Sequence, residues 1–193
     1  MFTLTTIAAW DVALLAKIAT LHSESATLFF LAITYLGEWY VVVSVFVLST
    51  LAFLYYKQWF LILPFWFATG GAMATTFLLK HFIDRARPLD ALIAETGSSM
   101  PSGHATIAVA LYGFLTWYLS RSERSGKKPD VPILVILIFL ISFSRLYLGV
   151  HYPSDVLMGM FVGGTFLFIA ISIVKMLLHK NETRQRSFHL RKK

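Results

Sequence analysis

The sequence predicts an all-α protein, a polytopic transmembrane helix bundle of five to six spans that forms a single domain. Of its 193 residues, 57% are hydrophobic and 14% are charged, and the mean hydropathy is +0.68. Soluble domains are usually about 45–50% apolar. The apolar residues are also gathered into five segments of about 20 residues, which is the length that a helix needs to cross a bilayer.

The five predicted spans are separated by short polar stretches. They cover Leu36 to Tyr56, Trp59 to Leu79, Gly103 to Ser120, Val131 to Leu148, and Ser154 to Met176. The stretch from Arg121 to Asp130 is a polar loop that contains Gly126 and Pro129, two residue types typical of turns. We therefore expect residues 36–176 to form the transmembrane core and residues 177–193 to form a basic tail.

The first 35 residues are predicted to form interfacial helices. Apolar residues recur at helical spacing, with Asp11 and Lys17 flanking the apolar arc; they are Ile7, Trp10, Leu14, Ile18 and Leu21. A helix in the plane of the interface is the preferred interpretation, because Asp11 would be costly near the middle of a span. A sixth span is the alternative. Ala26 to Tyr35 would form a second short helix.

The net charge of +7 is better explained by orientation of the chain in a membrane than by binding to nucleic acid. If the fifth span ends in the cytoplasm, span parity places 12 of the 17 Lys and Arg residues there; they are Lys57, Arg121, Arg124, Lys127, Lys128, Lys175, Lys180, Arg184, Arg186, Arg191, Lys192 and Lys193. Cytoplasmic loops carry an excess of such residues. The expected location is a bacterial inner membrane, with the other end of the bundle facing the periplasm or exterior.

Cysteine and leader-peptide chemistry are not expected. The chain contains no cysteine, which excludes disulfides and thiolate catalysis. The N-terminus lacks a basic stretch, and Asp11 interrupts its apolar run, so the sequence does not predict a cleavable signal peptide.

Three polar motifs lie at or near the ends of predicted spans. The first is Lys80 followed by Arg87-Pro88, the second is Pro101-Ser102-Gly103-His104, and the third is Ser144-Arg145 followed by His151 and Asp155. Charges at such positions are costly and mark functional sites. The same span parity that places most cations at one end of the bundle places the three motifs at the other end. We therefore expect the three motifs to form one site.

The residue types in these motifs suit a phosphate group. Arginine offers a planar fork to two phosphate oxygens and lysine offers a point charge, so we expect Lys80, Arg87 and Arg145 to bind phosphate. Ser102 and Gly103 precede a predicted helix. Backbone N–H groups at a helix N-terminus bind anions, and glycine lets the anion approach closely.

His151 and Asp155 are four residues apart at the start of the fifth predicted span. At that spacing the carboxylate can reach one imidazole nitrogen, which fixes the tautomer and raises the basicity of the other nitrogen. We expect His151 to attack phosphorus and form a phosphohistidine. His104 would then protonate the leaving oxygen and later activate water.

The order and spacing of the three motifs resemble the signature of the type 2 phosphatidic acid phosphatase family, which vanadium haloperoxidases and glucose-6-phosphatase share. Every defining position is present, and the resemblance covers roughly residues 25–176. It implies a fold of the acid phosphatase/vanadium haloperoxidase type and the same roles for His151, His104 and Asp155. It also implies catalysis without a metal or other cofactor, because the three cations supply the positive charge.

The expected function is therefore that of an integral membrane lipid phosphatase. The resemblance suggests undecaprenyl diphosphate and phosphatidylglycerophosphate first, then phosphatidic acid and a lipid A phosphate. The expected partners are the lipid phosphate and the membrane, and no nucleic acid. The alternatives are a lipid phosphotransferase with the same site, a vanadate-holding haloperoxidase, which the hydrophobicity disfavours, and a non-catalytic membrane scaffold.

Other polar residues carry weaker expectations. His81, Asp84 and Arg85 are interpreted as parts of a solvated loop, with an outer-layer or headgroup role as the alternative. Glu38, beside Trp39, is expected at the membrane interface. Gly159 and Gly163 form a Gly-x-x-x-Gly motif. We expect it to pack helices within the monomer rather than between monomers.

Overall fold

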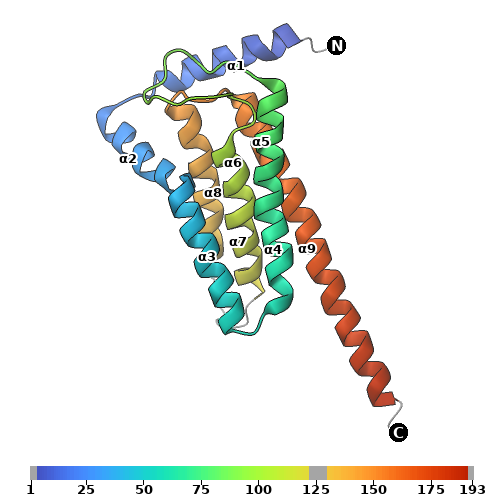
Figure 1. The fold of residues 1–193 in the computed structure, drawn as a ribbon. Helices are drawn as coiled ribbons and strands as arrows, with labels where there is room; N and C mark the ends of the chain where they lie inside the picture. The colour runs from blue at the N-terminus through green and yellow to red at the C-terminus, as the bar shows by residue number, and fades with distance from the viewer. Residues whose placement is uncertain (1–3, 122–129, 191–193) are drawn as a thin grey trace.

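The computed structural model describes residues 4–121 and 130–190, and in these residues the protein is an all-helical bundle (Figure 1). The α-helices are α1 (Leu4–Ala19), α2 (Glu24–Thr34), α3 (Trp39–Tyr55), α4 (Ile62–Trp66), α5 (Ala72–Ile83), α6 (Gly103–Ile107), α7 (Gly113–Ser120), α8 (Asp130–Tyr147) and α9 (Pro153–Leu190). Short 3-10 turns are η1 (Tyr35–Gly37) and η2 (Trp59–Leu61), and π-helical turns are η3 (Phe67–Gly71) and η4 (Ala108–Tyr112). The π turns join their neighbours into two longer rods, 59–83 and 103–120.

Two helices of the described chain are long and apolar enough to cross a bilayer, Trp59–Ile83 and Pro153–Lys180. The pair Glu24–Gly37 and Trp39–Tyr55 is bent by 48° and qualifies as a third if it forms one broken span. Val131–Tyr147 is a shorter apolar helix. The transmembrane character of the predicted bundle is thus supported, whereas the number of five spans stays a prediction.

Three of the predicted helix boundaries differ from the structure. The first predicted span begins at Leu36, but the chain breaks at Glu38 and α3 starts at Trp39. The second continues past Lys80 to Ile83, where Asp84 adopts a left-handed conformation (φ 41°) that ends the helix. The fifth continues past Met176 to Leu190. Hydropathy marks where an apolar run ends, and a helix of polar residues can continue beyond that point.

Helix α1 lies across one end of the bundle instead of alongside the other helices (Figure 1). This arrangement is the one that an interfacial helix requires. The predicted apolar face is only partly correct, because Trp10 is 49% exposed whereas Asp11 is fully buried and Ile18 is 6% exposed. Asp11 faces the bundle because hydrogen-bond donors from the site meet it there.

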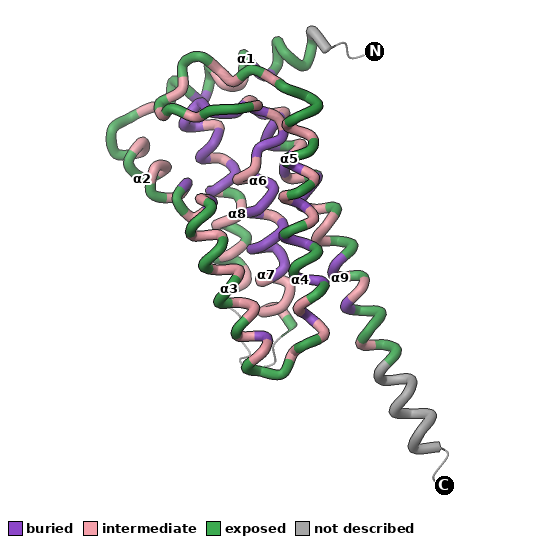
Figure 2. Tube along the Cα trace, in the orientation of Figure 1, coloured by how far each residue is buried: buried purple, intermediate pink, exposed green. Residues whose placement is uncertain are grey.

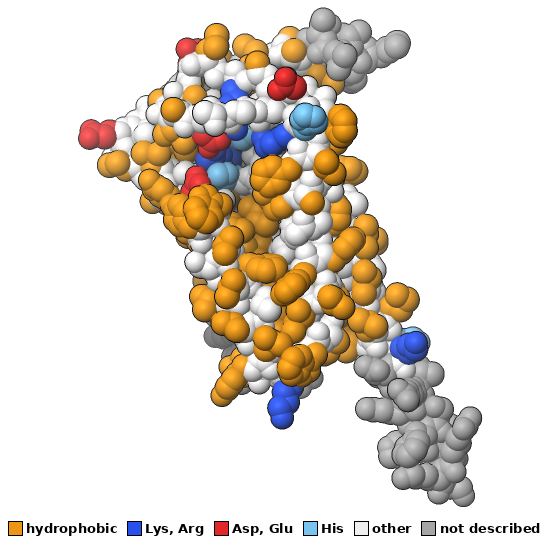
Figure 3. Space-filling model, viewed as in Figure 1, with side chains coloured by type: hydrophobic (Ala, Val, Ile, Leu, Met, Phe, Trp, Pro, Cys, Tyr) orange, Lys and Arg blue, Asp and Glu red, His pale blue; other side chains and the backbone are white. Residues whose placement is uncertain are grey.

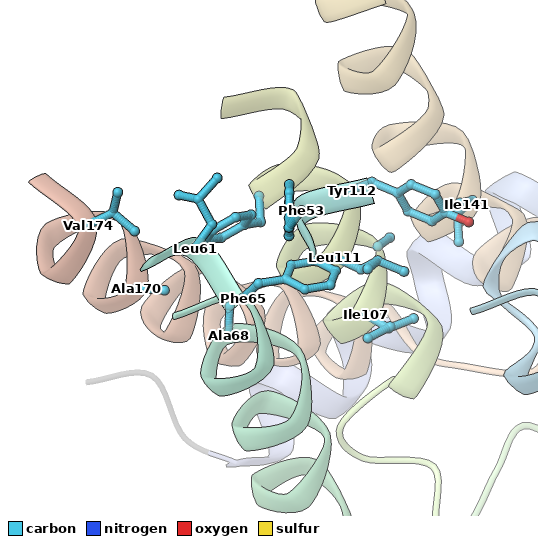
Figure 4. Packing of buried hydrophobic residues seen from close by; sticks show 12 residues of the cluster. Phe53, Leu61, Phe65, Ala68, Ile107, Leu111, Tyr112, Ile141, Ala170 and Val174 are labelled. Atoms are coloured by element: carbon cyan, nitrogen blue, oxygen red, sulfur yellow. The ribbon is translucent and has the colours of Figure 1, made fainter. Parts of the chain in front are cut away.

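The core lies in the middle of the bundle, where Figure 2 shows the buried stretches of chain. Phe53, Phe65 and Phe114 contact one another there through edge and tilted ring contacts, and Figure 4 shows Phe53 and Phe65 within this cluster. The outer sides of the bundle instead carry many apolar side chains (Figure 3). Leu63 in α4 is 77% exposed, and Phe168 in α9 is 72% exposed. Apolar patches of this extent mark an interaction surface, as expected for helices in contact with lipid.

Helix α9 packs closely against α6 through the predicted glycine motif. A Cβ atom at Gly159 would lie 2.5 Å from the carbonyl oxygen of Ser102, and one at Gly163 would lie 2.4 Å from that of Thr106. Both glycines therefore allow two backbones of the same monomer to approach. This confirms the prediction for the motif, and it places the start of α9 beside the start of α6.

Candidate active site

The three polar motifs converge at the end of the bundle that α1 crosses. Figure 3 shows Lys, Arg and acidic side chains gathered at this end, above sides that are mostly apolar. Lys80 lies in the last turn of α5, Arg145 in the last turn of α8, and Asp155 in the first turn of α9. Arg87 comes from the segment between α5 and α6, and His151 from the turn between α8 and α9. The predicted site residues thus meet at one place.

His151 and Asp155 face each other in a buried pair. The Nδ1 atom of His151 lies 3.6 Å from Oδ2 of Asp155, and Oγ of Ser99 lies 3.4 Å from the same nitrogen. His151 is 2% exposed, and Asp155 and Ser99 are fully buried. The His–Asp distance is longer than a hydrogen bond, but such contacts are often long in a site without substrate. The arrangement leaves Nε2 of His151 as the nitrogen that can react.

Three donors fix the carboxylate of Asp155. Its Oδ1 accepts a bond of 2.6 Å from Nη1 of Arg85. Its Oδ2 accepts a bond of 2.8 Å from the backbone N–H of Tyr152 and a further bond from Oγ of Ser99. The carboxylate therefore has little freedom to rotate away from His151.

Arg87 lies beside the reactive nitrogen of His151. Its Nη1 donates to the carbonyl oxygen of Val150 at 2.9 Å and lies 3.4 Å from Nε2 of His151. Its Nε and Nη2 donate to the carbonyl oxygens of Gly97 and Thr96 at 3.0 and 3.2 Å. These bonds hold the guanidinium group in place next to the imidazole.

The carboxylate of Glu95 lies between two of the predicted phosphate-binding arginines. Its Oε2 is 3.0 Å from Nη1 of Arg87, and its Oε1 forms an ion pair with Nη2 of Arg145. Arg145 is fully buried, and its Nη1 donates to Oγ1 of Thr34 at 2.5 Å. Guanidinium groups bind phosphate and carboxylate with the same fork of donors. Glu95 therefore marks an anion-binding position beside His151.

Among the residues that the structure describes, two further polar groups of the site are buried with neither a hydrogen-bond nor an ion-pair partner, namely Nε of Arg145 and Oγ of Ser102. Buried polar groups in native structures are nearly always paired, so both groups are available to a ligand. The backbone N–H of Ser102 is not available, because it donates to the carbonyl oxygen of Asp155 at 3.0 Å. Of Ser102 itself, the hydroxyl group is therefore the free donor, and the anion contact through the backbone N–H groups at the start of α6 stays a prediction. Gly103 begins α6 directly after it.

His104 pairs with a residue that the sequence analysis assigned to the membrane interface. Its Nε2 lies 3.4 Å from Oε1 of Glu38, which follows the η1 turn. Lys80, on the neighbouring α5, donates through Nζ to the carbonyl oxygen of Ser98. Glu38 therefore belongs to the site, where it can orient the His104 imidazole.

Burial keeps His151 neutral. The pKa of His151 is lowered from 6.5 to about 4, chiefly by desolvation; the contact with Asp155 opposes this shift, and the positive charges of Arg145, Arg87 and Lys80 add to it. A neutral imidazole retains the lone pair that an attack on phosphorus requires. Within residues 4–121 and 130–190, no cluster of three or more His, Asp or Glu side chains could hold a metal ion.

Four charged residues of this site were not predicted from the sequence: Asp11, Glu38, Arg85 and Glu95. Arg85 was interpreted as part of a solvated loop, but it pairs with both Asp11 and Asp155. His81 and Asp84 are exposed as expected, but His81 lies in the last turn of α5 and not in a loop. An acidic residue in an apolar N-terminal helix was a usable signal for Asp11, because a carboxylate in such a place needs a partner.

The fold and the site define a transmembrane helix bundle with an anion-binding centre at one end. Residues 59–178, more than half of the chain, match the model of the PAP2 superfamily, and the chain belongs to that superfamily.

Individual relatives agree with this assignment. The chain is 35% identical over 96 residues to phosphatidylglycerophosphatase B of Bacillus subtilis, covering 48% of this chain and 47% of that one. It is 34% identical over 117 residues to decaprenylphosphoryl-5-phosphoribose phosphatase of Mycobacterium tuberculosis, covering 56% and 60%. The chain thus spans about half to three fifths of the length of these curated relatives. The crystal structure of a transmembrane PAP2 type phosphatidylglycerolphosphate phosphatase from Bacillus subtilis superposes with a TM-score of 0.81 at 27% identity, covering 88% and 87% of the two chains.

Proposed function

We propose that this protein is an integral membrane phosphatase that removes phosphate from a lipid phosphate or diphosphate through a phosphohistidine on His151. One observation carries the proposal. The neutral His151 presents Nε2 to a position lined by Arg87, while its Nδ1 faces the buried carboxylate of Asp155. The ion pair of Glu95 with Arg87, which lies beside that nitrogen, supports an anion position there.

The geometry supports a two-step reaction. Nε2 of His151 attacks phosphorus, the bond from phosphorus to the leaving oxygen breaks, and His104 donates a proton to that oxygen. Water then attacks the phosphohistidine, His104 accepts the proton of that water, and the N–P bond breaks to release phosphate. Lys80, Arg87, Arg145 and the Ser102 hydroxyl stabilise the charge on the phosphoryl oxygens, and Gly103 leaves space beside them.

A lipid is the substrate class that the surroundings of the site favour. Glu38 and His104 keep 30% and 15% of their side chains exposed. Beside Glu38, Trp39 is 74% exposed, at the start of the apolar outer face of α3. A substrate could therefore place its phosphate in the site while its apolar chain stays in the bilayer. The similarity to a phosphatidylglycerophosphatase and to a decaprenylphosphoryl-5-phosphoribose phosphatase supports the same class.

The proposed location is a bacterial inner membrane with the site facing the periplasm. The turn between α3 and α4 and the end of α7 lie at the end of the bundle opposite to the site (Figure 1). Lys57 and Arg121 belong to that end, and the positive-inside rule makes it cytoplasmic.

The test is phosphate release by the purified protein in detergent from a panel of lipid phosphates and diphosphates, with undecaprenyl diphosphate and phosphatidylglycerophosphate included. His151→Ala should abolish release, and the exposed His81→Ala should keep it. If the rate of the His151→Ala variant were within tenfold of the wild-type rate, the activation barrier would have risen by at most about 1.4 kcal/mol. So small a rise would contradict a covalent role. Transfer of phosphate to an added alcohol without free phosphate would instead identify a phosphotransferase.

A further inference from the structure

We propose that Arg85 and Asp11 are positioning residues that hold the Asp155 carboxylate against His151, so that helix α1 takes part in catalysis. This inference rests on the proposed phosphatase function and deepens it. Neither residue belongs to the three polar motifs, and α1 lies outside the segment that matches the family model.

Arg85 bridges two buried carboxylates. Its Nη1 lies 2.6 Å from Oδ1 of Asp155, and its Nη2 lies 2.7 Å from Oδ2 of Asp11. Both carboxylates are fully buried, whereas the side chain of Arg85 is 23% exposed. Charge-assisted bonds of this length are the strong ones. The guanidinium group therefore links the first helix of the chain to the residue that orients His151.

Asp11 is itself fixed to the start of α9. Its Oδ1 accepts a bond of 2.9 Å from the backbone N–H of Ser154, and its Oδ2 accepts one of 2.6 Å from the Ser154 hydroxyl. A carboxylate at this place satisfies backbone donors that a helix leaves unpaired in its first turn. Asp155 follows Ser154 directly, so Asp11 anchors both the backbone beside Asp155 and the arginine that bonds it.

An aromatic ring fixes the guanidinium group of Arg85. Its Cζ lies 4.3 Å from the centroid of the Tyr152 ring, which is a favourable cation–π distance. Tyr152 also donates its backbone N–H to Oδ2 of Asp155. Arg85 occupies Oδ1 of that carboxylate, and Oδ2 is thereby left to face His151. Without Arg85 the carboxylate could rotate, so the orientation of the His151 imidazole would be less fixed, although the Asp155 charge would remain beside it.

The contacts of Arg85 separate it from the phosphate-binding groups. Its side chain bonds Asp11, Asp155 and the Ser154 hydroxyl, and none of these residues lines the anion position beside Glu95. A change at Arg85 should therefore reduce kcat and leave KM nearly unchanged. A role in binding the lipid headgroup would have the opposite effect.

The protonation of His151 gives a second readout. His151 is faced by Asp155 from α9, Arg145 from α8, Lys80 from α5 and Arg87 from the loop. If Arg85 is removed, the Asp155 charge is no longer shared with a guanidinium group, so it stabilises the protonated imidazole more strongly. The acid limb of the rate profile should then move to higher pH. A loss of folding alone would lower the rate without moving that limb.

The experiment compares Arg85→Gln, Arg85→Lys and Asp11→Asn with the wild type in the phosphate-release assay. Arg121→Gln is the matched control for arginine, because Arg121 also stacks on an aromatic ring, that of Trp117, at the opposite end of the bundle. Exposed Asp84→Asn is the control for aspartate. We expect Arg85→Gln to lower kcat at least tenfold with KM within about threefold, Arg85→Lys to restore the pH profile in part, and both controls to keep wild-type values.

A double-mutant cycle tests the link between the two residues. If Asp11 acts through Arg85, the variant with both Asp11→Asn and Arg85→Gln should lose no more activity than Arg85→Gln alone. Wild-type kcat and an unmoved acid limb in folded Arg85→Gln or Asp11→Asn would overturn the inference, as would a change confined to KM. The proposed function has its own readout in the same assay, because it fails only if the wild type releases no phosphate or His151→Ala retains release.

Discussion

Gly37 lies so close to His104 that a Cβ atom at position 37 would be 2.5 Å from Cδ2 of the imidazole ring. The η1 turn that contains Gly37 therefore forms the wall against which His104 rests. Glu38 follows directly and lies 3.4 Å from Nε2 of the same ring. One short turn thus sets both the position and the pairing of the second histidine.

Gly37→Ala should displace the His104 imidazole and lower kcat by roughly a hundredfold, because a shift of about 1 Å in a reacting group has an effect of that size. The measurement is steady-state phosphate release with a thermal melt of the same sample. Gly70→Ala is the matched control, since a Cβ atom there would meet nothing within 4 Å. Equal activities of the two variants would show that His104 has room to adjust or is not needed.

The sequence was sufficient to predict the motif residues that converge at the site, and insufficient for the residues that hold them in place. Lys80, Arg87, His104, Arg145 and His151 were identified because each has a fixed spacing within its motif, and the ends of apolar helices limited where these motifs could lie. The partners Asp11, Glu38 and Glu95 are separated from the motifs by chain of no recognisable pattern. Their contacts arise only when α1, η1 and the 84–102 loop close over the bundle.

Glu95→Gln should lower the KM for a lipid phosphate by about threefold or more. The Glu95 carboxylate pairs with Arg87 and Arg145 at the anion position, so the substrate phosphate must displace it. A neutral amide competes less for the two guanidinium groups. The same variant should be inhibited by lower concentrations of inorganic phosphate. Glu24→Gln, at an exposed residue of α2, is the control, and an increased KM in Glu95→Gln would show that Glu95 assists binding instead.

Vanadate should inhibit the proposed release of phosphate, and a chelator should not. Vanadate becomes five-coordinate and resembles the phosphoryl group in the transition state, which an active site binds most tightly. Lys80, Arg87 and Arg145 would supply the charge stabilisation that metal ions supply in other phosphatases. Activity is measured after treatment with EDTA and again after addition of magnesium. If EDTA removes the activity and magnesium restores it, the role given to the three cations is wrong.

The folded protein should lose stability in acid because His151 is buried as the neutral imidazole. Its pKa falls from 6.5 in the unfolded chain to about 4 in the folded protein, so below pH 6.5 the unfolded state binds more protons. The contribution of the neutral His151 to the free energy of unfolding is therefore complete above about pH 6.5, and it is lost as the pH falls towards 4. His151→Gln, which does not titrate, should show a weaker decrease of Tm across this window. Parallel curves for the two proteins would show that His151 is not neutral in the fold.

Residues on the two ends of the bundle should be accessible from opposite sides of the membrane. Ala94 belongs to the exposed part of the 84–102 loop at the site, and Ser125 lies in the polar loop 121–130, outside the described residues. The chain has no native cysteine, so single cysteines at Ala94 and Ser125 can be labelled without background. An impermeant maleimide added to intact spheroplasts should label the first, and the second only after the membrane is opened.

The reverse labelling pattern would mean that the protein has the opposite orientation in the membrane. The phosphatase reaction would then take place in the cytoplasm, against the positive-inside rule. Labelling of both positions from the same side would mean that the chain between them does not cross the bilayer. Position 94 and position 125 are separated by the 103–120 rod alone, so the test reports directly on that rod. It is also the rod that carries His104, and its crossing decides whether the site and the cation-rich end lie in different compartments.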